Sequence, residues 1–245
     1  MPTSPLQNVS IVLVDTKTPA NIGATARCMM NMGMDRLVLV NPPKDRDNEA
    51  RKLAAGANAV LEKAHVFTSL PEAIAGHGLV IATSRHAGRL RQNIRTPREA
   101  SELAVPLLAQ NRVAIVFGNE VNGLENSDLA LCHEIVAIPS SEAFPSLNLS
   151  HAVMVMAYEL FSASNASSAP SSIELACTED VEDLYRHLQK TLQSIGFLEQ
   201  DHPERMMFSF RQIFGRARLN SRDVSIFQGV LSTVDRVIRP DKKNP

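Results

Sequence analysis

The sequence is poor in aromatic residues: tryptophan is absent, and phenylalanine and tyrosine together make up 4% of the 245 residues. Stacking of bases on aromatic rings therefore cannot be the main way in which this chain would contact a nucleic acid. Cysteine is also scarce. Cys28, Cys132 and Cys177 have neither metal-ligand spacing nor the pattern of a disulfide framework, so we expect buried apolar thiols in a reducing compartment.

Long apolar runs are missing as well. No stretch of 18 apolar residues occurs, and no charged segment followed by an apolar core opens the sequence. We therefore expect a cytoplasmic protein that neither enters a membrane nor is exported. The seven histidines, His151 among them, show no metal-ligand spacing, and no metal is expected.

The net charge of −1 hides two runs of arginine. Residues 84–98 contain five arginines and no acid, and residues 203–222 contain five arginines and one acid, Glu204. Each run can be a solvated surface, or it can bind phosphates through the forked guanidinium group. The candidates for RNA contact in these runs are Arg89, Arg91, Arg95, Arg211, Arg216 and Arg218.

Apolar strands alternate with amphipathic helices through the first two thirds of the chain. The expected strands are 9–14, 37–40, 64–67, 79–82, 113–117 and 135–138, and the expected helices are 22–32, 49–57, 71–75, 99–110 and 147–161. This alternation predicts an α/β domain with a parallel sheet covered by helices on both faces. We place this domain at residues 1–163.

A stretch of small polar residues then indicates a flexible linker, placed at 164–177. Three amphipathic stripes follow, the first ending at Gly196, and they predict a three-helix unit at 178–245. At about 65 residues such a unit has a marginal core, so docking on the main domain or on a partner chain is expected.

Three polar loops follow predicted strands. They contain the strings Asn21-x-Gly23-Ala24-x-x-Arg27, Phe117-Gly118-Asn119-Glu120-x-x-Gly123-Leu124, and Ile138-Pro139 followed by Ser146-Leu147-Asn148-Leu149-Ser150-x-Ala152. Open α/β sheets bind ligands at the carboxyl ends of their strands. The third string also runs into an apolar helix, whose first amides are free to bind a polar ligand.

These strings, in this order, resemble the three motifs of the SPOUT superfamily of methyltransferases, in its SpoU/TrmH branch of RNA ribose 2′-O-methyltransferases. The tail strings His202-Pro203 and 213–218 are similar to the C-terminal extension of TrmJ-type tRNA methyltransferases. The resemblance thus covers nearly the whole chain. It implies a trefoil knot at the end of the α/β domain, a homodimer whose sites are completed across the interface, and RNA as the substrate.

The resemblance also implies a cofactor, S-adenosylmethionine, bound in the knot. The residues implied to hold it are Thr83, Ser84, Arg85, Gly118, Asn119, Gly123, Ile138, Pro145, Ser146 and Leu147. Glycine at position 118 would let the backbone approach the ligand closely.

On the acceptor side, the family's catalytic arginine corresponds to Arg27. A guanidinium is a poor general base, so we expect Arg27 to orient the ribose 2′-hydroxyl, engage the adjacent phosphate and stabilise developing negative charge. Asn21 is either a helix cap or part of the site, and Ser146 and Asn148 can cap a helix and contact a ligand at once. Glu120 is expected to support the site by pairing with Arg27 or Asn148, or to be a surface carboxylate.

Three functions stay open. The first is methylation of a cytidine or uridine at nucleotide 32 of the tRNA anticodon loop, which the resemblance implies. The second is the same reaction on ribosomal RNA, because TrmJ proteins often carry arginine where this chain has Asn119. The third is an RNA-binding protein that has lost catalysis, although its motifs are intact.

Overall fold

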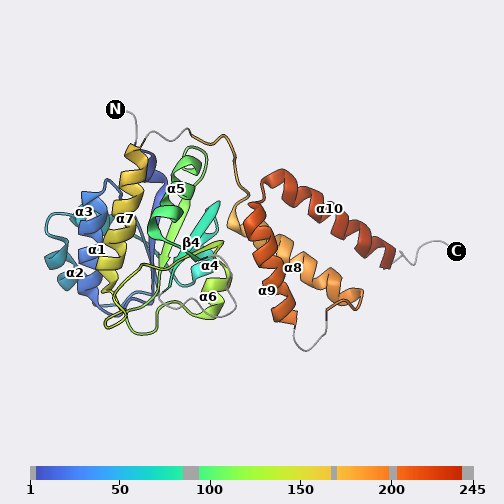
Figure 1. Ribbon diagram of the computed structural model, residues 1–245. Helices are drawn as coiled ribbons and strands as arrows, with labels where there is room; N and C mark the ends of the chain where they lie inside the picture. Colours follow the sequence, from blue (N-terminus) through green and yellow to red (C-terminus); the bar gives the residue numbers. More distant parts are fainter. Residues whose placement is uncertain (1–3, 85–93, 167–169, 199–202, 239–245) are drawn as a thin grey trace. The chain divides into compact units, whose positions relative to one another are not determined.

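The computed structural model describes residues 4–84, 94–166, 170–198 and 203–238 (Figure 1). The chain divides into two compact units, Met1–Ile173 and Glu174–Pro245. The first is an α/β unit and the second is helical. The division falls inside the segment that the sequence marks as a linker.

The α/β unit is built on a seven-stranded sheet in the order β3-β2-β1-β6-β4-β7-β5, and every pairing is parallel. Because all strands run the same way, their carboxyl ends share one edge, where the connecting loops gather. The strands are β1 (Val9–Val14), β2 (Arg36–Val40), β3 (His65–Phe67), β4 (Leu79–Thr83), β5 (Ile94–Arg95), β6 (Val113–Phe117) and β7 (Glu134–Val136).

Helices cover both faces of this sheet (Figure 1). Val12, Val38 and Val116 join a core cluster with Leu70 and Ile74 of α4 (Leu70–Ile74). The opposite face is covered by the helices α1 (Pro19–Asn31), α5 (Pro97–Leu107) and α7 (Leu149–Asn165). Burial on both faces explains why β1 and β6 are apolar at nearly every position.

The predicted elements are confirmed with shifts of a few residues, and three short ones were missed. These are β5, α3 (Asn58–Glu62) and α6 (Asn126–Ala130), each too short to show a periodic pattern. A 3-10 turn, η1 (Pro5–Asn8), precedes β1, and α2 (Asp47–Ala54) corresponds to the predicted 49–57. The end predicted for α7, at residue 161, is wrong: the helix continues through the small polar residues to Asn165.

The helical unit contains α8 (Thr178–Ser194), α9 (Pro203–Ala217) and α10 (Ser221–Ile238). Their apolar stripes meet in one core that includes Leu184, Tyr185, Met207 and Leu231. Gly196 follows the first helix with φ of +74°, a conformation that glycine adopts at little cost. The predicted three-helix unit is therefore present.

No helix in the described part of the chain has the length and apolar character needed to cross a membrane. The three cysteines are free, and each is only partly buried, whereas we expected buried thiols. The threading that would make a knot stays a prediction.

Candidate active site

The three motif loops meet at the carboxyl edge of the sheet, after β1, β6 and β7. In the sheet order β6 lies next to β1, and β4 separates β6 from β7. The loops after β4, β6 and β7 are therefore neighbours, with the β1 loop on the β6 side. Strand order alone places the predicted cofactor residues beside the predicted acceptor residues.

Glu120 connects the second motif to the first. Its Oε1 accepts hydrogen bonds from Asn21 Nδ2 at 2.7 Å and from the Thr18 amide at 3.1 Å, and its Oε2 accepts one from the Lys17 amide at 3.0 Å. The two amides belong to the β1–α1 loop and to the start of α1, where backbone donors lack helical partners. Glu120 thus fixes the entry to α1, and the partners expected from the sequence, Arg27 and Asn148, are not the ones it takes.

Asn148 connects the third motif to the first. Its Nδ2 donates to Asn21 Oδ1 at 3.0 Å, while its Oδ1 accepts from the Ser150 amide at 2.9 Å and from Ser150 Oγ at 2.7 Å. Asn148 is the N-cap of α7, so the expectation that it caps a helix is confirmed. Asn21 is not a cap, because Thr18 holds that position on α1. The side chain of Asn21 donates to Glu120 and accepts from Asn148.

The pKa of Glu120 lies below its ordinary value. Partial burial by itself would raise this pKa, but the hydrogen bonds donated by the Lys17 amide, the Asn21 side chain and the Thr18 amide stabilise the ionised form and outweigh it. An ionised carboxylate whose oxygens already accept three hydrogen bonds is a weak proton acceptor. Glu120 therefore supports the site.

The loop after β6 is folded by its own residues. Asn119 Oδ1 accepts from the Val121 and Asn122 amides at 3.0 and 2.8 Å, which closes a tight turn. A Cβ at Gly118 would lie 2.1 Å from the backbone carbon of Gly123, so only glycine fits there. The reason for glycine at position 118 is thus this internal contact, and close approach to a cofactor is not needed to explain it.

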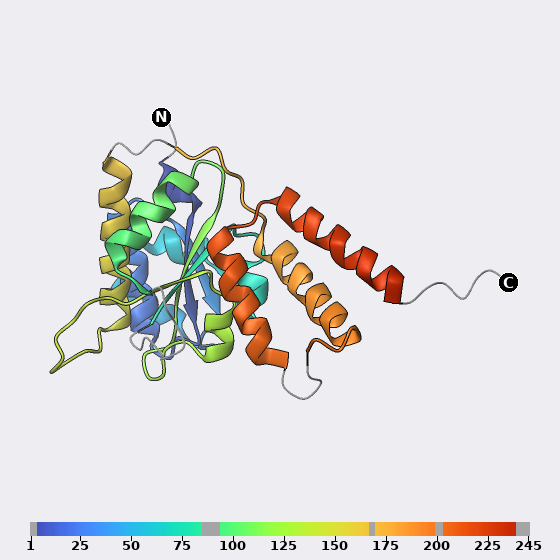
Figure 2. The ribbon, with the colours of Figure 1, turned by 45° about the vertical axis from the view of Figure 1, so that its right-hand side comes forward.

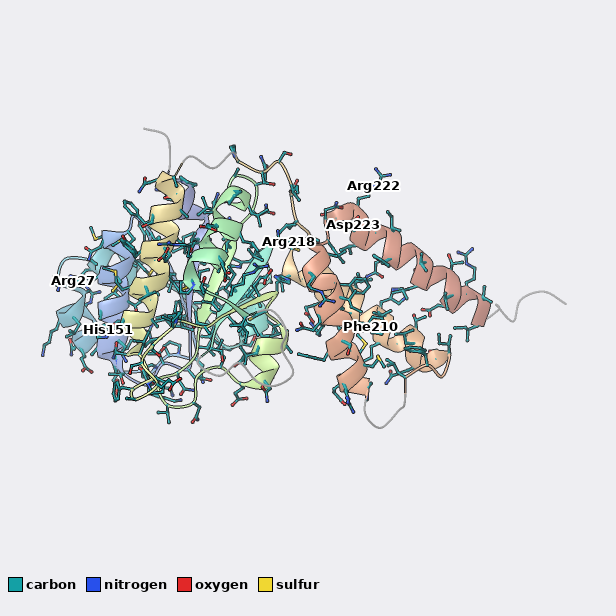
Figure 3. The ribbon with its side chains drawn as sticks, viewed as in Figure 1. Arg27, His151, Phe210, Arg218, Arg222 and Asp223 are labelled. Carbon is teal, nitrogen blue, oxygen red and sulfur yellow. The ribbon has the colours of Figure 1, made fainter. Side chains whose placement is uncertain are left out.

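Arg27 is exposed on α1, one residue before Cys28, whose thiol donates to the Ser150 carbonyl on α7 at 3.6 Å. This contact brings Arg27 and the exposed His151 to the same outer side of the unit, as Figure 3 shows. Burial raises the pKa of the Cys28 thiol, although the positive charge of Arg27 acts in the opposite direction. Cys28 is therefore a neutral thiol at neutral pH and is no candidate for a base or nucleophile.

The loops expected to hold the cofactor carry groups that suit it. Thr83 Oγ1 donates to the Val116 carbonyl at 3.1 Å, and the Ser84 amide donates to the Val136 carbonyl at 2.9 Å, so the end of β4 is tied to both neighbours. Pro145, Ser146 and Leu147 are exposed in the loop after β7, and Ile138 is partly buried. Backbone amides and carbonyls next to apolar side chains match a ligand with an adenine ring and a charged amino-acid end.

The candidate RNA-binding arginines fall into three groups. Arg89 and Arg91 lie outside the described residues, as does Arg85, which was expected to hold the cofactor. Arg95 Nε donates to the buried Glu134 at 2.9 Å. Arg211 forms a bidentate ion pair with Glu182, in which Nη2 lies 2.6 Å from Oε2. The guanidinium of Arg211 also lies 4.4 Å from the centre of the Tyr185 ring. Arg216 and Arg218 are exposed at the end of α9, and Figure 3 shows Arg218 there.

The contacts that sequence reasoning missed are the backbone donors of Lys17 and Thr18 and the Ser150 hydroxyl. Only the position of Ser150 inside the third string could have indicated its role. Amide donors leave no signal in the identity of a residue.

Comparison with known proteins decides which family carries this arrangement. A model described as the SpoU rRNA Methylase family matches residues 8–158, and one described as the tRNA methyltransferase TrmJ C-terminal domain matches residues 179–243. The chain is 39% identical over 243 residues to the Escherichia coli O6:K15:H31 (strain 536 / UPEC) protein called tRNA (cytidine/uridine-2'-O-)-methyltransferase TrmJ, covering 97% of this chain and 99% of that protein. It belongs to the TrmJ family of SpoU methylases.

Solved structures agree with this assignment. TrmJ from Z. mobilis ZM4 has a TM-score of 0.80 and 33% identity, covering 92% of this chain and 98% of that one. A probable methylase family protein from Haemophilus influenzae Rd KW20 has a TM-score of 0.63 and 34% identity, covering 97% and 100%. The fold expected from the resemblance, a SPOUT-type parallel sheet with helices on both faces and a helical tail, is confirmed, and TrmJ-family enzymes use S-adenosylmethionine.

Proposed function

We propose that the chain transfers the methyl group of S-adenosylmethionine to the ribose 2′-hydroxyl of a cytidine or uridine in tRNA, at nucleotide 32 of the anticodon loop. The observation that carries this proposal is the hydrogen-bonded chain from Glu120 through Asn21 to Asn148. It holds the acceptor-side helix, α1, in a fixed position relative to the loops after β6 and β7. A transfer that depends on in-line alignment needs such fixed positions.

The chemistry divides between cofactor and protein. The sulfonium supplies an activated methyl group when it is bound, so the protein has to align the acceptor and stabilise the negative charge that develops on the 2′-oxygen. We assign that stabilisation, and contact with the adjacent phosphate, to Arg27, which is exposed on α1. Thr83, Ser84, Gly118, Asn119, Gly123, Ile138, Pro145, Ser146 and Leu147 are the described residues that would surround the cofactor.

A tRNA substrate is supported by the printed activity of the relatives and by the match to the TrmJ C-terminal domain. The match to a model named for rRNA methylation, and the asparagine at position 119, favour ribosomal RNA as the second candidate. A tRNA-modifying enzyme would act in the cytoplasm.

The test is methyl transfer from labelled S-adenosylmethionine to whole tRNA and to ribosomal RNA fragments, with the methylated ribose mapped by its resistance to alkaline cleavage. Methylation of tRNA at nucleotide 32 is the expected result. Methylation of ribosomal RNA alone would establish the second candidate. Cofactor and RNA binding without methyl transfer to either RNA would establish an inactive RNA-binding protein.

The same proposal includes a homodimer. Apolar side chains are exposed on the outer side of α1 and α7: Met30 is 54% exposed, Tyr158 55% and Phe161 39%, next to Arg27 and His151. A twofold contact on this surface would cover them and would bring Arg27 of one protomer toward the cofactor loops of its partner.

Mixed dimers test both the contact and the shared site. Arg27→Ala removes the side chain that we assign to the acceptor ribose. Gly118→Ala disturbs the cofactor loop, because the added Cβ would meet the backbone of Gly123 at 2.1 Å. If the partner supplies Arg27, co-expressed mixed dimers contain one intact site and recover activity that neither variant has alone. If each site is built from one chain, the mixed dimer stays inactive. Circular dichroism and sedimentation of each variant provide the control for folding.

The helical tail is proposed to bind parts of tRNA away from the target ribose. The Ser171 amide donates to the Pro106 carbonyl at 2.9 Å, and Asn111 donates to the Ile173 carbonyl at 2.8 Å, so a clean truncation comes after Ile173. We expect the truncated chain to bind cofactor normally and to bind whole tRNA more weakly. Equal methylation of tRNA by both forms would make the tail structural only.

A further inference from the structure

The segment between β7 and α7 carries an aromatic ring into solvent. Phe144 is 78% exposed, more than any other large apolar side chain in the described residues. Figure 2 shows this segment, in yellow-green, reaching away from the sheet before it returns to the start of α7. In a chain with 4% aromatic residues, a ring in such a position is unusual.

Hydrogen bonds within the segment hold it in shape. Ser140 Oγ donates to the Pro145 carbonyl at 3.0 Å, and the Phe144 amide donates to the Ser141 carbonyl at 3.1 Å. The Ala143 amide also donates to Ser141 Oγ at 3.3 Å. The turn is thus closed by its own hydrogen bonds, and it presents the phenyl ring to solvent.

The segment ends at the acceptor side of the site. Four residues after Phe144, Asn148 donates to Asn21, and Asn21 is bound to Glu120. The ring therefore projects from a loop that begins at β7, beside the cofactor loops, and is fastened next to the helix of Arg27. Phe144 and Asn148 lie in the same segment, so the ring is carried by a loop that is bonded to α1, the helix of Arg27.

We propose that Phe144 stacks on the base of the nucleotide whose ribose is methylated and holds that base out of the RNA stack. This inference rests on the proposed function and deepens it. Bases in single-stranded loops are recognised when they are splayed out against aromatic side chains. The 2′-oxygen of such a nucleotide is accessible for in-line attack on the methyl group. A phenyl ring has no hydrogen-bonding group, so it adds affinity without selecting between cytidine and uridine.

Four variants test the contact. Phe144→Ala should weaken binding of whole tRNA about 5- to 100-fold, the effect of losing one base–aromatic stack, while the dissociation constant for S-adenosylmethionine stays the same. Phe144→Tyr and Phe144→Trp keep a flat ring and should retain affinity. Phe144→Leu keeps an apolar side chain without a ring and should resemble Phe144→Ala. A leucine variant with wild-type affinity would overturn the proposal, since simple apolar burial would then account for the contact.

A second measurement identifies the partner of the ring. Wild type and Phe144→Ala are each titrated with two tRNAs, one intact and one lacking the base at the nucleotide that wild type methylates. We expect the affinity loss from Phe144→Ala on intact tRNA and no further loss on the abasic tRNA. An equal loss on both RNAs would overturn the inference, because the ring would then contact something other than the target base.

Two controls distinguish base stacking from a contact with protein or with the cofactor. If Phe144→Ala sediments as a monomer while wild type sediments as a dimer, the ring belongs to a protein interface and the inference is wrong. If it weakens S-adenosylmethionine binding, the ring belongs to the cofactor site and the inference is again wrong. Wild type that neither binds nor methylates tRNA would instead reject the proposed function, and with it this inference.

Discussion

Asn148 donates a hydrogen bond to Asn21 at 3.0 Å across 127 residues of sequence. The bond joins the N-cap of α7 to the first turn of α1, and Glu120 extends the connection to the β6 loop. Three motifs that are far apart in the chain thus form one continuous polar network. We infer that this network fixes positions, because its members bond to one another.

Replacing Glu120 with glutamine tests this network. The amide keeps the shape but places an N–H group against donors, so we expect a loss of about 1–3 kcal/mol in the free energy of unfolding and a loss of turnover on the order of tenfold to a hundredfold. Because the pKa of Glu120 is lowered in the folded state, its charge stabilises the fold above the ordinary value of 4.5, and this contribution disappears as the pH falls through the lowered pKa. Urea unfolding at pH 7 and at pH 3.5 measures the difference.

Glu142→Gln is the matched control, since Glu142 is an exposed glutamate in the loop after β7. It should leave stability and turnover unchanged. A Glu120→Gln protein as stable as this control at pH 7 would show that neither the charge of Glu120 nor its hydrogen bond with the Lys17 amide contributes to stability.

Replacing Arg27 separates the acceptor from the cofactor. Arg27→Ala should lower methyl transfer at least about 100-fold and leave cofactor affinity within about threefold, because we place this exposed side chain on the acceptor side. Arg27→Lys keeps the charge without the forked geometry and should also be poor. Single-turnover rates and calorimetry with S-adenosylmethionine provide the two readouts. Near-normal turnover of the alanine variant would contradict the assignment.

His77 should make the stability of the α/β unit depend on pH. Burial lowers the pKa of His77 to about 4 from an ordinary value of 6.5. The positive charges of Arg36 and Arg112 act in the same direction, and the hydrogen bond to the Ile74 carbonyl acts against it. Between these values the unfolded chain binds a proton that the folded chain does not, so stability is complete above pH 6.5 and falls as the pH drops toward 4. The expected loss is about 3 kcal/mol.

The measurement is the urea midpoint between pH 7 and pH 4 for wild type and His77→Gln. The variant loses the hydrogen bond between His77 Nε2 and Ser10 Oγ, at 2.9 Å, and should be less stable at pH 7. Its stability should fall less between pH 6.5 and 4. An unchanged pH profile would show that the pKa of His77 is not lowered in the folded protein.

Sequence reasoning predicted the sheet, the three motif loops and the helical tail, because buried strands and amphipathic helices leave periodic patterns. It did not predict the partners of Glu120, since two of them are backbone amides that any residue at positions 17 and 18 would supply. It also considered Arg95 and Arg211 only as solvated surface residues or RNA contacts, and not as partners in ion pairs. Counting charges along each run could not show that Glu134 pairs with Arg95 and Glu182 with Arg211, because both glutamates lie outside the runs.

Arg211 and Arg216 should therefore behave differently although both lie on α9. Arg211→Ala leaves the partly buried Glu182 without its partner and removes the guanidinium from the Tyr185 ring, which should destabilise the tail by about 2 kcal/mol. Arg216→Ala removes an exposed charge and should lower the salt slope of tRNA binding by up to about one, with the tail intact. Hydrogen exchange of the α8 and α9 amides, measured beside salt titrations of binding, separates the two effects. Equal exchange rates in both variants would show that the Arg211 pair is not structural.

The position of β1 in the sheet has a consequence for folding. Val9 of β1 pairs with Val113 of β6. One edge of β1 is therefore completed by a strand that is synthesised about a hundred residues later. The β1–β2 pair can form early, but its other edge stays open until β6 has left the ribosome. We expect slow closure of this sheet during synthesis, with an exposed apolar edge that holdase chaperones would cover, because distant strand pairing delays folding and unpaired edges attract other chains.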